Sequence, residues 1–288
     1  MTIAGGNGPG NQSNQLFFPN GIYMDDHNQY IYIVDWGNHR IVEWKSNVKI
    51  SRVVAGGNGQ GNRMDQLNNP TDVIVDKRSD SLIICDRGNI RVMQWSRQNR
   101  TNGQIIISNI HCYGLAIDKN GDLYVSDTKK GEVKRWNRGE MERTIVAGGN
   151  REGNQLNWPS YLFVDEYYSV YVSDQYNHRV MKWTKGAKQG IVVAGGQGKG
   201  NSLTQLNYPE GIVVDHLDNV YIADSGNHRI MCWSKGSKQG RLIVGGDRTG
   251  QQPNQLSQLG DVLLDRQGHL YVVDRGNSRV QKFEIDLN

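Results

Sequence analysis

The sequence is poor in cysteine and proline and has no long apolar run. It contains 3 cysteines and 6 prolines among 288 residues. The cysteines, at positions 85, 112 and 232, are odd in number and show no paired spacing, which argues against a disulfide framework and a thiolate metal cluster. No stretch is apolar and long enough to cross a bilayer. Residues Met1–Gly6 lack the basic and apolar regions of a signal peptide. We therefore expect no membrane partner. The chain can equally be a domain excised from a longer protein, so the sequence does not predict the cellular compartment.

The numbers of positively and negatively charged residues are nearly equal. Lysine and arginine number 33 and aspartate and glutamate 29, a formal net charge of +4. This excess is small for the length and gives only weak support for nucleic-acid binding. Glycine, in contrast, is abundant with 35 residues, which indicates many turns.

Internal repetition dominates the sequence. Each of six segments, which align without gaps, contains an aspartate, a short turn and a strand-like run, and the aspartates follow one another at intervals of 41 to 51 residues. The segments are VDWGNHRIVEW (34–44), CDRGNIRVMQW (85–95), SDTKKGEVKRW (126–136), SDQYNHRVMKW (173–183), ADSGNHRIMCW (223–233) and VDRGNSRVQKF (273–283).

Each repeat predicts four short strands. In the fifth repeat they are GIVVD (211–215), NVYIA (219–223), HRIMCW (228–233) and LIVGG (242–246). Runs of β-branched and aromatic residues between Gly, Asn and Asp turns are typical of strands. No segment keeps a 3.6-residue apolar period, so almost no helix is expected. Because neighbouring blades can bury both faces of a four-stranded sheet, the repeats predict an all-β, six-bladed β-propeller of four-stranded antiparallel blades.

We assign a single domain to residues 1–288. The blades are expected at about 17–57, 68–109, 110–149, 157–196, 207–246 and 258–285. The last repeat ends at Asn288 without a fourth strand, whereas residues 2–6 match the fourth-strand pattern. The N-terminal strand is therefore predicted to complete the last blade and remove its open edge.

The repeat resembles the NHL-repeat family. The matching motif, Asp-x-x-Asn-His-Arg-Ile/Val, is complete at 35–41, 174–180 and 224–230. It is weakened at Ile90 and Ser278 and lost at Lys130-Gly131-Glu132, so the third blade should be the most irregular. The resemblance implies a propeller. Because the family includes RNA-binding, protein-binding, sensor and lyase domains, it decides little about function. The lyases hold zinc with inner-strand histidines, and the inner strands here contain none.

Features common to all repeats are interpreted as structural. The glycine-rich segments 5–11, 56–62 and 195–201 look like phosphate loops, but no helix follows them, so they are predicted to cross between blades. His39, His178 and His228 share one repeat position and are expected to bond locally. The aspartates that end strands are expected to cap turns.

Basic residues gather in the turn between the third and fourth strands. This turn is predicted to be either a solvated turn or part of a basic rim for phosphate or acidic partners. Its residues are Lys45, Lys49, Arg97, Arg100, Arg138, Arg143, Lys185, Lys188, Lys235 and Lys238.

Function is expected where the blades differ from one another. Two variable sets, one at the start of the first strand and one after the second-strand aspartate, are predicted to face the mouth of the channel. Exposed Trp, Tyr and Arg residues are typical of binding hot spots. The expected partner-binding residues are Trp36, Arg87, Tyr113, Tyr161, Tyr176 and Arg275. The chain is thus predicted to be a monomeric, non-catalytic scaffold that binds a protein or peptide and needs no cofactor.

Two alternatives remain open from the sequence. One is a calcium-dependent, lactonase-type hydrolase, because calcium takes six to eight oxygen ligands. Its candidate ligands are Asn20, Asp72, Glu210 and Asp261. The other is an RNA-binding domain of the NHL type, which would need a concentrated positive face with stacking aromatics.

Overall fold

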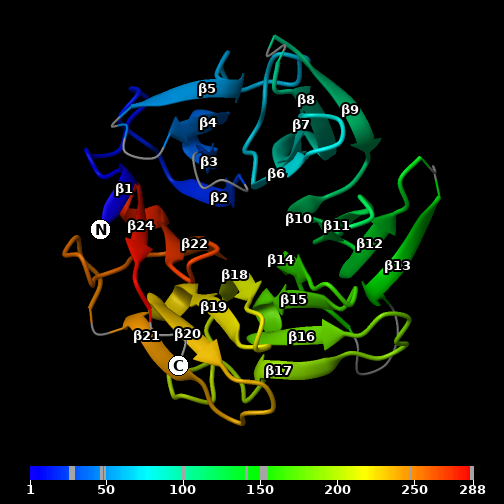
Figure 1. Cartoon of the computed structure of the whole chain (residues 1–288), viewed down its shortest axis with the longest axis vertical. Helices are drawn as coiled ribbons and strands as arrows, with labels where there is room; N and C mark the ends of the chain where they lie inside the picture. The colour runs from blue at the N-terminus through cyan, green and yellow to red at the C-terminus, as the bar shows by residue number, and fades with distance from the viewer. Residues whose placement is uncertain are drawn as a thin grey trace. The chain divides into compact units, whose positions relative to one another are not determined.

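The computed structural model describes residues 1–25, 30–45, 48, 50–98, 101–139, 142–149, 155–246 and 248–285. The chain forms two compact units. Unit 1 comprises Met1–Ile110 with Thr249–Asn288, and unit 2 comprises His111–Arg248. Each unit contains three four-stranded antiparallel sheets, the blades seen in Figure 1. These sheets and the near absence of helix confirm the predicted all-β, six-bladed β-propeller.

Unit 1 holds blades 1, 2 and 6. Blade 1 consists of β2 (Pro19–Met24), β3 (Tyr30–Asp35), β4 (Arg40–Lys45) and β5 (Ser51–Gly56). Blade 2 consists of β6 (Asp72–Asp76), β7 (Ser81–Asp86), β8 (Arg91–Ser96) and β9 (Gly103–Ser108). Blade 6 consists of β22 (Leu259–Leu264), β23 (Leu270–Asp274), β24 (Arg279–Phe283) and β1 (Thr2–Gly5).

Unit 2 holds blades 3, 4 and 5. Blade 3 consists of β10 (Cys112–Ile117), β11 (Leu123–Asp127), β12 (Glu132–Trp136) and β13 (Arg143–Gly148). Blade 4 consists of β14 (Pro159–Val164), β15 (Val170–Asp174), β16 (Arg179–Trp183) and β17 (Ile191–Gly195). Blade 5 consists of β18 (Pro209–Val214), β19 (Val220–Asp224), β20 (Arg229–Trp233) and β21 (Arg241–Gly245).

A short 3-10 turn links the second and third strands in five blades. These turns are η1 (Trp36–Asn38), η2 (Arg87–Asn89), η3 (Gln175–Asn177), η4 (Ser225–Asn227) and η5 (Arg275–Asn277). The residue after each turn has a left-handed backbone, with φ of 54° at His39 and 53° at His178. This reversal directs the chain back along the sheet as the third strand.

The N-terminal strand completes blade 6, as predicted. Within unit 1, β1 pairs antiparallel with β24, with Thr2 opposite Gln281 and Gly5 opposite Arg279. The N–H of Gly6 donates to the carbonyl of Ser278 at 3.1 Å, and the side chain of Ala4 is buried. The edge of β24 is therefore covered by a strand that comes from the other end of the chain.

The core of each unit lies between the faces of adjacent blades. Buried clusters join Tyr32 of blade 1 to Trp95 of blade 2, and Tyr171 of blade 4 to Trp233 of blade 5. Burial of one side chain of this size contributes roughly 2–3 kcal/mol. Burial also raises the pKa of Tyr32 to about 12, so its hydroxyl stays protonated and can donate at neutral pH.

Asp35 shows why the repeat motif exists. Its Oδ1 accepts a hydrogen bond from the N–H of Phe17 at 2.7 Å. Its Oδ2 accepts from Asn38 at 2.8 Å and from Nε of Arg40 at 2.7 Å. Arg40 also donates to the carbonyl of Asn11, in the glycine-rich crossing segment. Burial raises the pKa of Asp35, and the amide and guanidinium donors oppose that rise. Where its arginine is present, the motif thus attaches the crossing segment to its blade, a structural role.

Blade 3 departs from the repeat, as predicted. Between β11 and β12 the chain makes a plain turn in place of a 3-10 turn. The buried carboxylate of Asp127 lacks the usual arginine, because Glu132 occupies that position. Instead Nζ of Lys134 lies 2.7 Å from Asp127 Oδ2 and 2.9 Å from Glu132 Oε1. A cation two residues further along the strand therefore replaces the missing one.

The cysteines differ from the expectation. Cys85 and Cys112 are each disulfide-bonded, so the inference from their spacing was wrong. Spacing along the chain does not reveal how close two Cα atoms come in the fold. Cys232 is a free, buried thiol whose pKa is raised by burial. Such a thiol carries little thiolate and is a poor nucleophile.

Within the described residues, no helix is both long enough and apolar enough to span a membrane.

Candidate functional site

Three of the predicted partner-binding residues lie in unit 1 and begin 3-10 turns. Trp36 begins η1, Arg87 begins η2 and Arg275 begins η5, and all three side chains are half-buried. Arg275 donates a hydrogen bond to Oδ1 of Asn20. The structure therefore links one predicted partner-binding residue to one predicted calcium ligand.

The polar residues at the start of the first strands in unit 1 connect neighbouring blades. Asn20 of blade 1 donates to the carbonyl of Thr71 of blade 2 at 3.0 Å. Asp261 of blade 6 accepts from the N–H of Ile22 of blade 1 at 3.3 Å. Asp72 accepts from the next N–H in its own strand at 2.8 Å. All three side chains are buried, so this variable position is used for packing between blades.

This arrangement does not fit the calcium alternative. The Asn20 oxygen that would ligate a cation already accepts a hydrogen bond from the positively charged Arg275. Both carboxylate oxygens of Asp261 accept backbone N–H groups. Calcium needs six to eight available oxygens, and an adjacent guanidinium opposes its binding. Among the described residues, no group of three or more His, Cys, Asp or Glu is arranged to hold a metal.

In unit 2, Tyr113, Tyr161 and Glu210 are buried together. The exposed fraction is 6% for Tyr113 and 2% for Tyr161, and their rings meet edge to face at 5.4 Å. Oε1 of Glu210 accepts from the Tyr113 hydroxyl at 3.3 Å and from Nε2 of Gln175 at 2.6 Å. The expectation that these two tyrosines are exposed was therefore wrong, because the first strands of blades 3, 4 and 5 pack side by side.

Tyr176, in contrast, is exposed and belongs to an aromatic cluster that the sequence analysis missed. Its exposed fraction is 45%. Its ring stacks on Trp158 at a centroid distance of 5.4 Å and meets Tyr208 edge to face at 5.6 Å. Tyr208 also contacts the ring of His178 at 4.8 Å, and Nζ of Lys199 lies 4.8 Å from the Tyr208 centroid. We call Trp158, Tyr176 and Tyr208 the aromatic cluster.

Two members of the aromatic cluster have an unfavourable backbone. The φ angle is 60° at Trp158 and 50° at Tyr208, in the left-handed region where a bulky side chain costs about 1–2 kcal/mol. Both residues precede a proline that begins a first strand. The equivalent residue of blade 2 is Asn69, which tolerates a φ of 47° more readily. An aromatic residue at this repeat position was the sequence signal that could have revealed the cluster.

Unit 1 has a related aromatic group around Trp36. Phe18 has a φ of 49°, and its ring contacts Phe17 at 5.1 Å and Trp36 at 6.5 Å. Phe17 and Phe18 are both exposed. Aromatic side chains are enriched in binding interfaces.

His178 fixes one side of the aromatic cluster. Its Nδ1 accepts the N–H of Tyr208 at 3.2 Å, which requires an unprotonated Nδ1. Partial burial lowers the pKa of His178, and the nearby Lys199 lowers it further. His39 makes the equivalent bond to the N–H of Asn69 at 3.1 Å. These two histidines therefore bond to the backbone at the start of the next blade, and not within their own repeat as expected.

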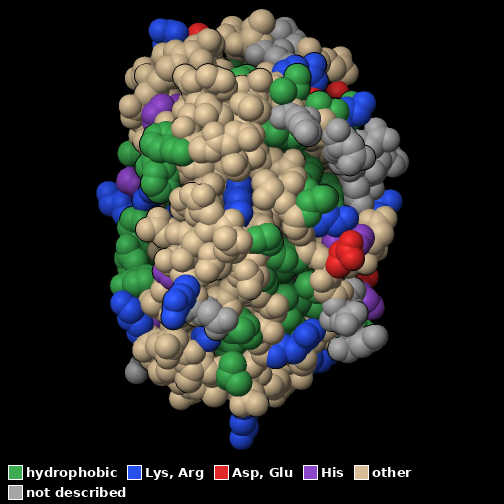
Figure 2. All heavy atoms as spheres, turned by 90° about the vertical axis from the view of Figure 1, so that its left-hand side faces the viewer, with side chains coloured by type: hydrophobic (Ala, Val, Ile, Leu, Met, Phe, Trp, Pro, Cys, Tyr) green, Lys and Arg blue, Asp and Glu red, His purple; other side chains and the backbone are tan. Residues whose placement is uncertain are grey.

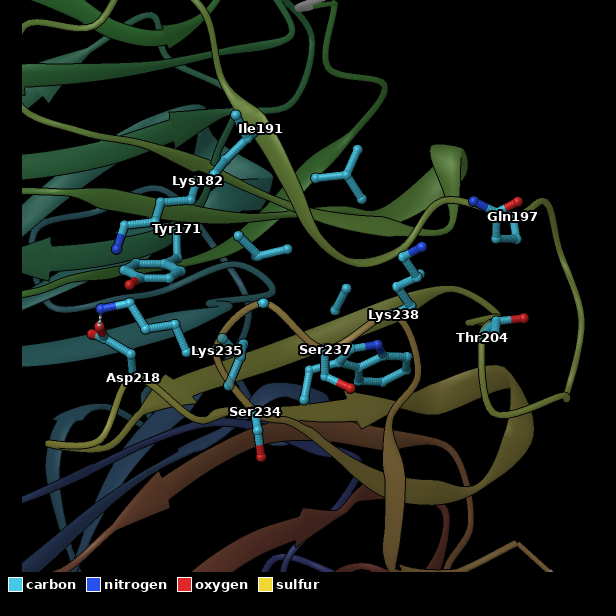
Figure 3. Close-up of a pocket in the computed structure, with 17 residues that line it drawn as sticks. Tyr171, Lys182, Ile191, Gln197, Thr204, Asp218, Ser234, Lys235, Ser237 and Lys238 are labelled. Carbon is cyan, nitrogen blue, oxygen red and sulfur yellow. Dashed lines mark hydrogen bonds and ion pairs between the residues drawn. The ribbon is translucent and has the colours of Figure 1, made fainter.

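Unit 2 also contains a groove between blades 4 and 5. Its volume is about 870 Å³, and it runs along β17 beside the turn 234–238 (Figure 3). Asp218 and Lys235 form an ion pair of 2.6 Å at one end, and Ile191 and Lys238 lie further along it. The groove is therefore both basic and apolar.

The face shown in Figure 2 carries scattered Lys and Arg side chains among hydrophobic and uncharged ones, with few acidic side chains. The basic residues of that face do not gather into a single dense patch. Two residues of the predicted basic turns, Lys49 and Arg100, lie outside the described residues.

Two segments of the chain, 206–233 and 256–283, match the NHL repeat. They contain the second and third strands of blades 5 and 6 with the aspartate and arginine of the motif. The chain therefore contains NHL repeats within its β-propeller. A search of curated proteins finds no matching sequence for this propeller.

Solved structures resemble the NHL propeller in fold. An auxiliary nutrient binding protein from Bacteroides thetaiotaomicron has 16% identity and a TM-score of 0.77, covering 98% of this chain and 75% of that chain. A nidogen/laminin complex has 15% identity and a TM-score of 0.64, covering 78% and 79%. The virginiamycin B lyase of Staphylococcus aureus has 12% identity and a TM-score of 0.58, covering 96% and 88%. At these identities the likeness concerns the fold alone.

Proposed function

We propose that this NHL propeller is a non-catalytic module that binds a protein or peptide partner. Trp36, Arg87 and Arg275 of unit 1 and Tyr176 of unit 2 are the predicted residues proposed to contact the partner. Tyr113 and Tyr161 are buried and are not proposed as contact residues. In unit 2 the contact surface includes the aromatic cluster.

The exposure of the aromatic cluster is the observation that carries this proposal. Large rings at a surface cost solvation free energy, and two of them also cost backbone strain. Packing does not require them, because blade 2 has Asn69 and blade 6 has Gln258 at the same position with a similar backbone. Tyr and Trp are enriched among residues that dominate binding energy. Recognition explains their presence better than folding does.

The test uses peptides selected by the protein itself. A random peptide library is panned against the propeller, and the affinity of the selected peptides is measured for Trp36→Ala and Tyr176→Ala. Each variant is expected to weaken binding about tenfold or more, with an unchanged melting temperature. Tyr167→Ala is the matched control, because Tyr167 is an exposed tyrosine in the turn 165–169.

Selection of no peptide, or of peptides whose affinity neither variant changes, would contradict the proposal. Equal weakening by Tyr167→Ala would show that the peptides bind exposed aromatic rings without specificity.

A further inference from the structure

Unit 2 contains a second groove that repeats the first. It lies between blades 3 and 4, has a volume of about 360 Å³, and runs along β13 beside the turn 184–188. The groove between blades 4 and 5 runs along β17 beside the turn 234–238. We call these two the basic grooves. Volumes of this order suit bound ligands or peptide segments.

Equivalent residues line the basic grooves. Arg135 and Lys182 occupy the same third-strand position, because each lies opposite the second-strand tyrosine of its blade. In the turns, the second and fifth residues after the strand-ending tryptophan are lysines in both blades. The six basic residues are Arg135, Lys185 and Lys188 in one groove and Lys182, Lys235 and Lys238 in the other.

Acidic residues are scarce in the basic grooves. Among the described lining residues, the groove between blades 3 and 4 has none. The other has only Asp218, which is paired with Lys235 at 2.6 Å. Lys182 lies 3.7 Å from Asp165 and 4.6 Å from the centroid of the Tyr171 ring. The blade 1 residue at the same position is Glu43, opposite Tyr32. Blade 6 also has a lysine at this position, Lys282 opposite Tyr271. The positive charge of the two basic grooves is complementary to an acidic partner.

Each basic groove also presents apolar side chains on an open strand. The exposed fractions are 61% for Ile191 and 47% for Val192 on β17, and 54% for Ile145 on β13. Both strands are terminal in their sheets, with no further strand paired to them among the described residues. An open edge can pair with an added strand. Figure 3 shows Ile191 and Lys182 of blade 4 and Lys238 of blade 5 bordering one such groove.

The aromatic rings of the basic grooves favour a peptide over a nucleic acid. Trp183 and Trp233 are buried, as are Tyr124 and Tyr171. The one further ring among the described lining residues is Tyr168, which is half-buried and has Nζ of Lys185 4.3 Å from its centroid. Single-stranded nucleic acids bind where successive bases stack on accessible rings, and the four buried rings are covered. Exposed aliphatic side chains and an open strand suit an extended peptide instead.

We propose that the basic grooves bind an extended acidic peptide. Its backbone adds as a strand to β17, or to β13 in the second groove. Its alternating acidic side chains contact the lysines and arginine, and its apolar side chains contact Ile191, Val192 or Ile145. This surface is separate from the aromatic cluster, so its test is independent of the proposed function above.

A synthetic fluorescent peptide of alternating glutamate and valine tests the proposal by fluorescence anisotropy. We expect saturable binding that weakens about tenfold or more in the double variant Lys188→Glu/Lys238→Glu, which reverses one charge in each groove. The control is Arg78→Glu/Arg266→Glu, which makes the same change of net charge at exposed turn residues of unit 1. This control should change the affinity less than about twofold.

Three further measurements decide the nature of the ligand. The same peptide with alternate backbone amides N-methylated should lose binding, because it cannot pair as a strand, and a lysine–valine peptide should not bind. The proposal is overturned if the glutamate–valine peptide fails to bind, if the N-methylated peptide binds equally well, or if the control variant weakens binding as much. Tighter binding of a polyadenylate oligonucleotide than of the peptide would also overturn it.

Discussion

The hydroxyl of Tyr113 in blade 3 donates a hydrogen bond to Oε1 of Glu210 in blade 5, with an oxygen–oxygen distance of 3.3 Å. Gln175 of blade 4 donates to the same oxygen at 2.6 Å. One buried carboxylate thus connects three consecutive blades of unit 2. A charged acceptor in such a position depends on its donors, because without them it remains desolvated and uncompensated.

Removing the Tyr113 hydroxyl should therefore destabilise the protein. We expect Tyr113→Phe to lower the free energy of unfolding by about 1–2 kcal/mol, since the ring stays packed and only the donor is lost. Urea denaturation followed by fluorescence measures the change. Tyr167→Phe, at an exposed position, is the control and should leave the midpoint unchanged. If the Tyr113 variant unfolds at the midpoint of the parent protein, the bond to Glu210 contributes nothing.

Deletion of residues 1–6 should expose the edge of blade 6. The loss of the hydrogen bonds of β1 and of the buried Ala4 is expected to lower the free energy of unfolding by ~3 kcal/mol or more, or to cause association of the chains. Thermal unfolding and light scattering measure both effects. Thr2→Asp, an exposed change within the same strand, should shift stability by only about 0.5 kcal/mol. A monomeric deletion variant with an unchanged melting temperature would reject closure by β1.

The ion pair of blade 3 can be tested by moving its positive charge from position 134 to position 132 of β12. Lys134→Met should cost about 3–5 kcal/mol, because it leaves the carboxylates of Asp127 and Glu132 buried without their cation. The double variant Glu132→Arg/Lys134→Met restores the arrangement of blade 5, where Arg229 bonds Asp224 and Met231 follows. We expect the double variant to recover most of that loss in a denaturation experiment. A double variant less stable than Lys134→Met would show that the lysine is required for another reason.

Stability should fall in mild acid through His39 and His178. Burial lowers the pKa of both below the unfolded value of about 6.5. The folded state then binds fewer protons than the unfolded state, so the stabilising contribution is complete above about pH 6.5 and is lost as pH falls through the folded pKa. Unfolding free energies between pH 5 and 8 measure this slope.

The matched variant for the pH experiment is His39→Asn/His178→Asn. Asparagine tolerates the left-handed backbone, and its side-chain oxygen can accept the same N–H groups without titrating. We expect a shallower slope between pH 5 and 6.5 than in the parent protein. The buried aspartates are common to both proteins and cancel in the difference. Identical slopes would exclude these histidines as the cause.

The fold followed from the repeats because each strand of a blade has its own sequence signal. The aspartate of the motif and the tyrosine of the second strand, such as Asp224 and Tyr221, indicate the register of five blades, and Ile83 replaces the tyrosine in blade 2. The missing fourth strand of the last repeat identified the closing strand. Regular spacing constrains backbone geometry directly, so these predictions needed no knowledge of side-chain exposure.

The residues of the candidate site could be predicted less well from the sequence, because variation between repeats has two causes. Tyr113 and Tyr161 differ from their counterparts where first strands of neighbouring blades pack against one another, and Tyr176 differs where the chain meets solvent. A single sequence cannot distinguish these causes, since both give aromatic residues at irregular positions. The strained positions of Trp158 and Tyr208 become evident only from their φ angles.

Closure of blade 6 by β1 also sets an order of events during synthesis. Thr2 is synthesised long before its partner Gln281. At roughly 5–20 residues per second, β1 waits on the order of 15–55 s for β24. During that interval Ile3 and Ala4 have no sheet to join, although both belong to the apolar cluster of the finished unit. A ribosome that stalls before residue 279 therefore leaves β1 unpaired and the edge of β23 open, because β24 lies between them in the sheet.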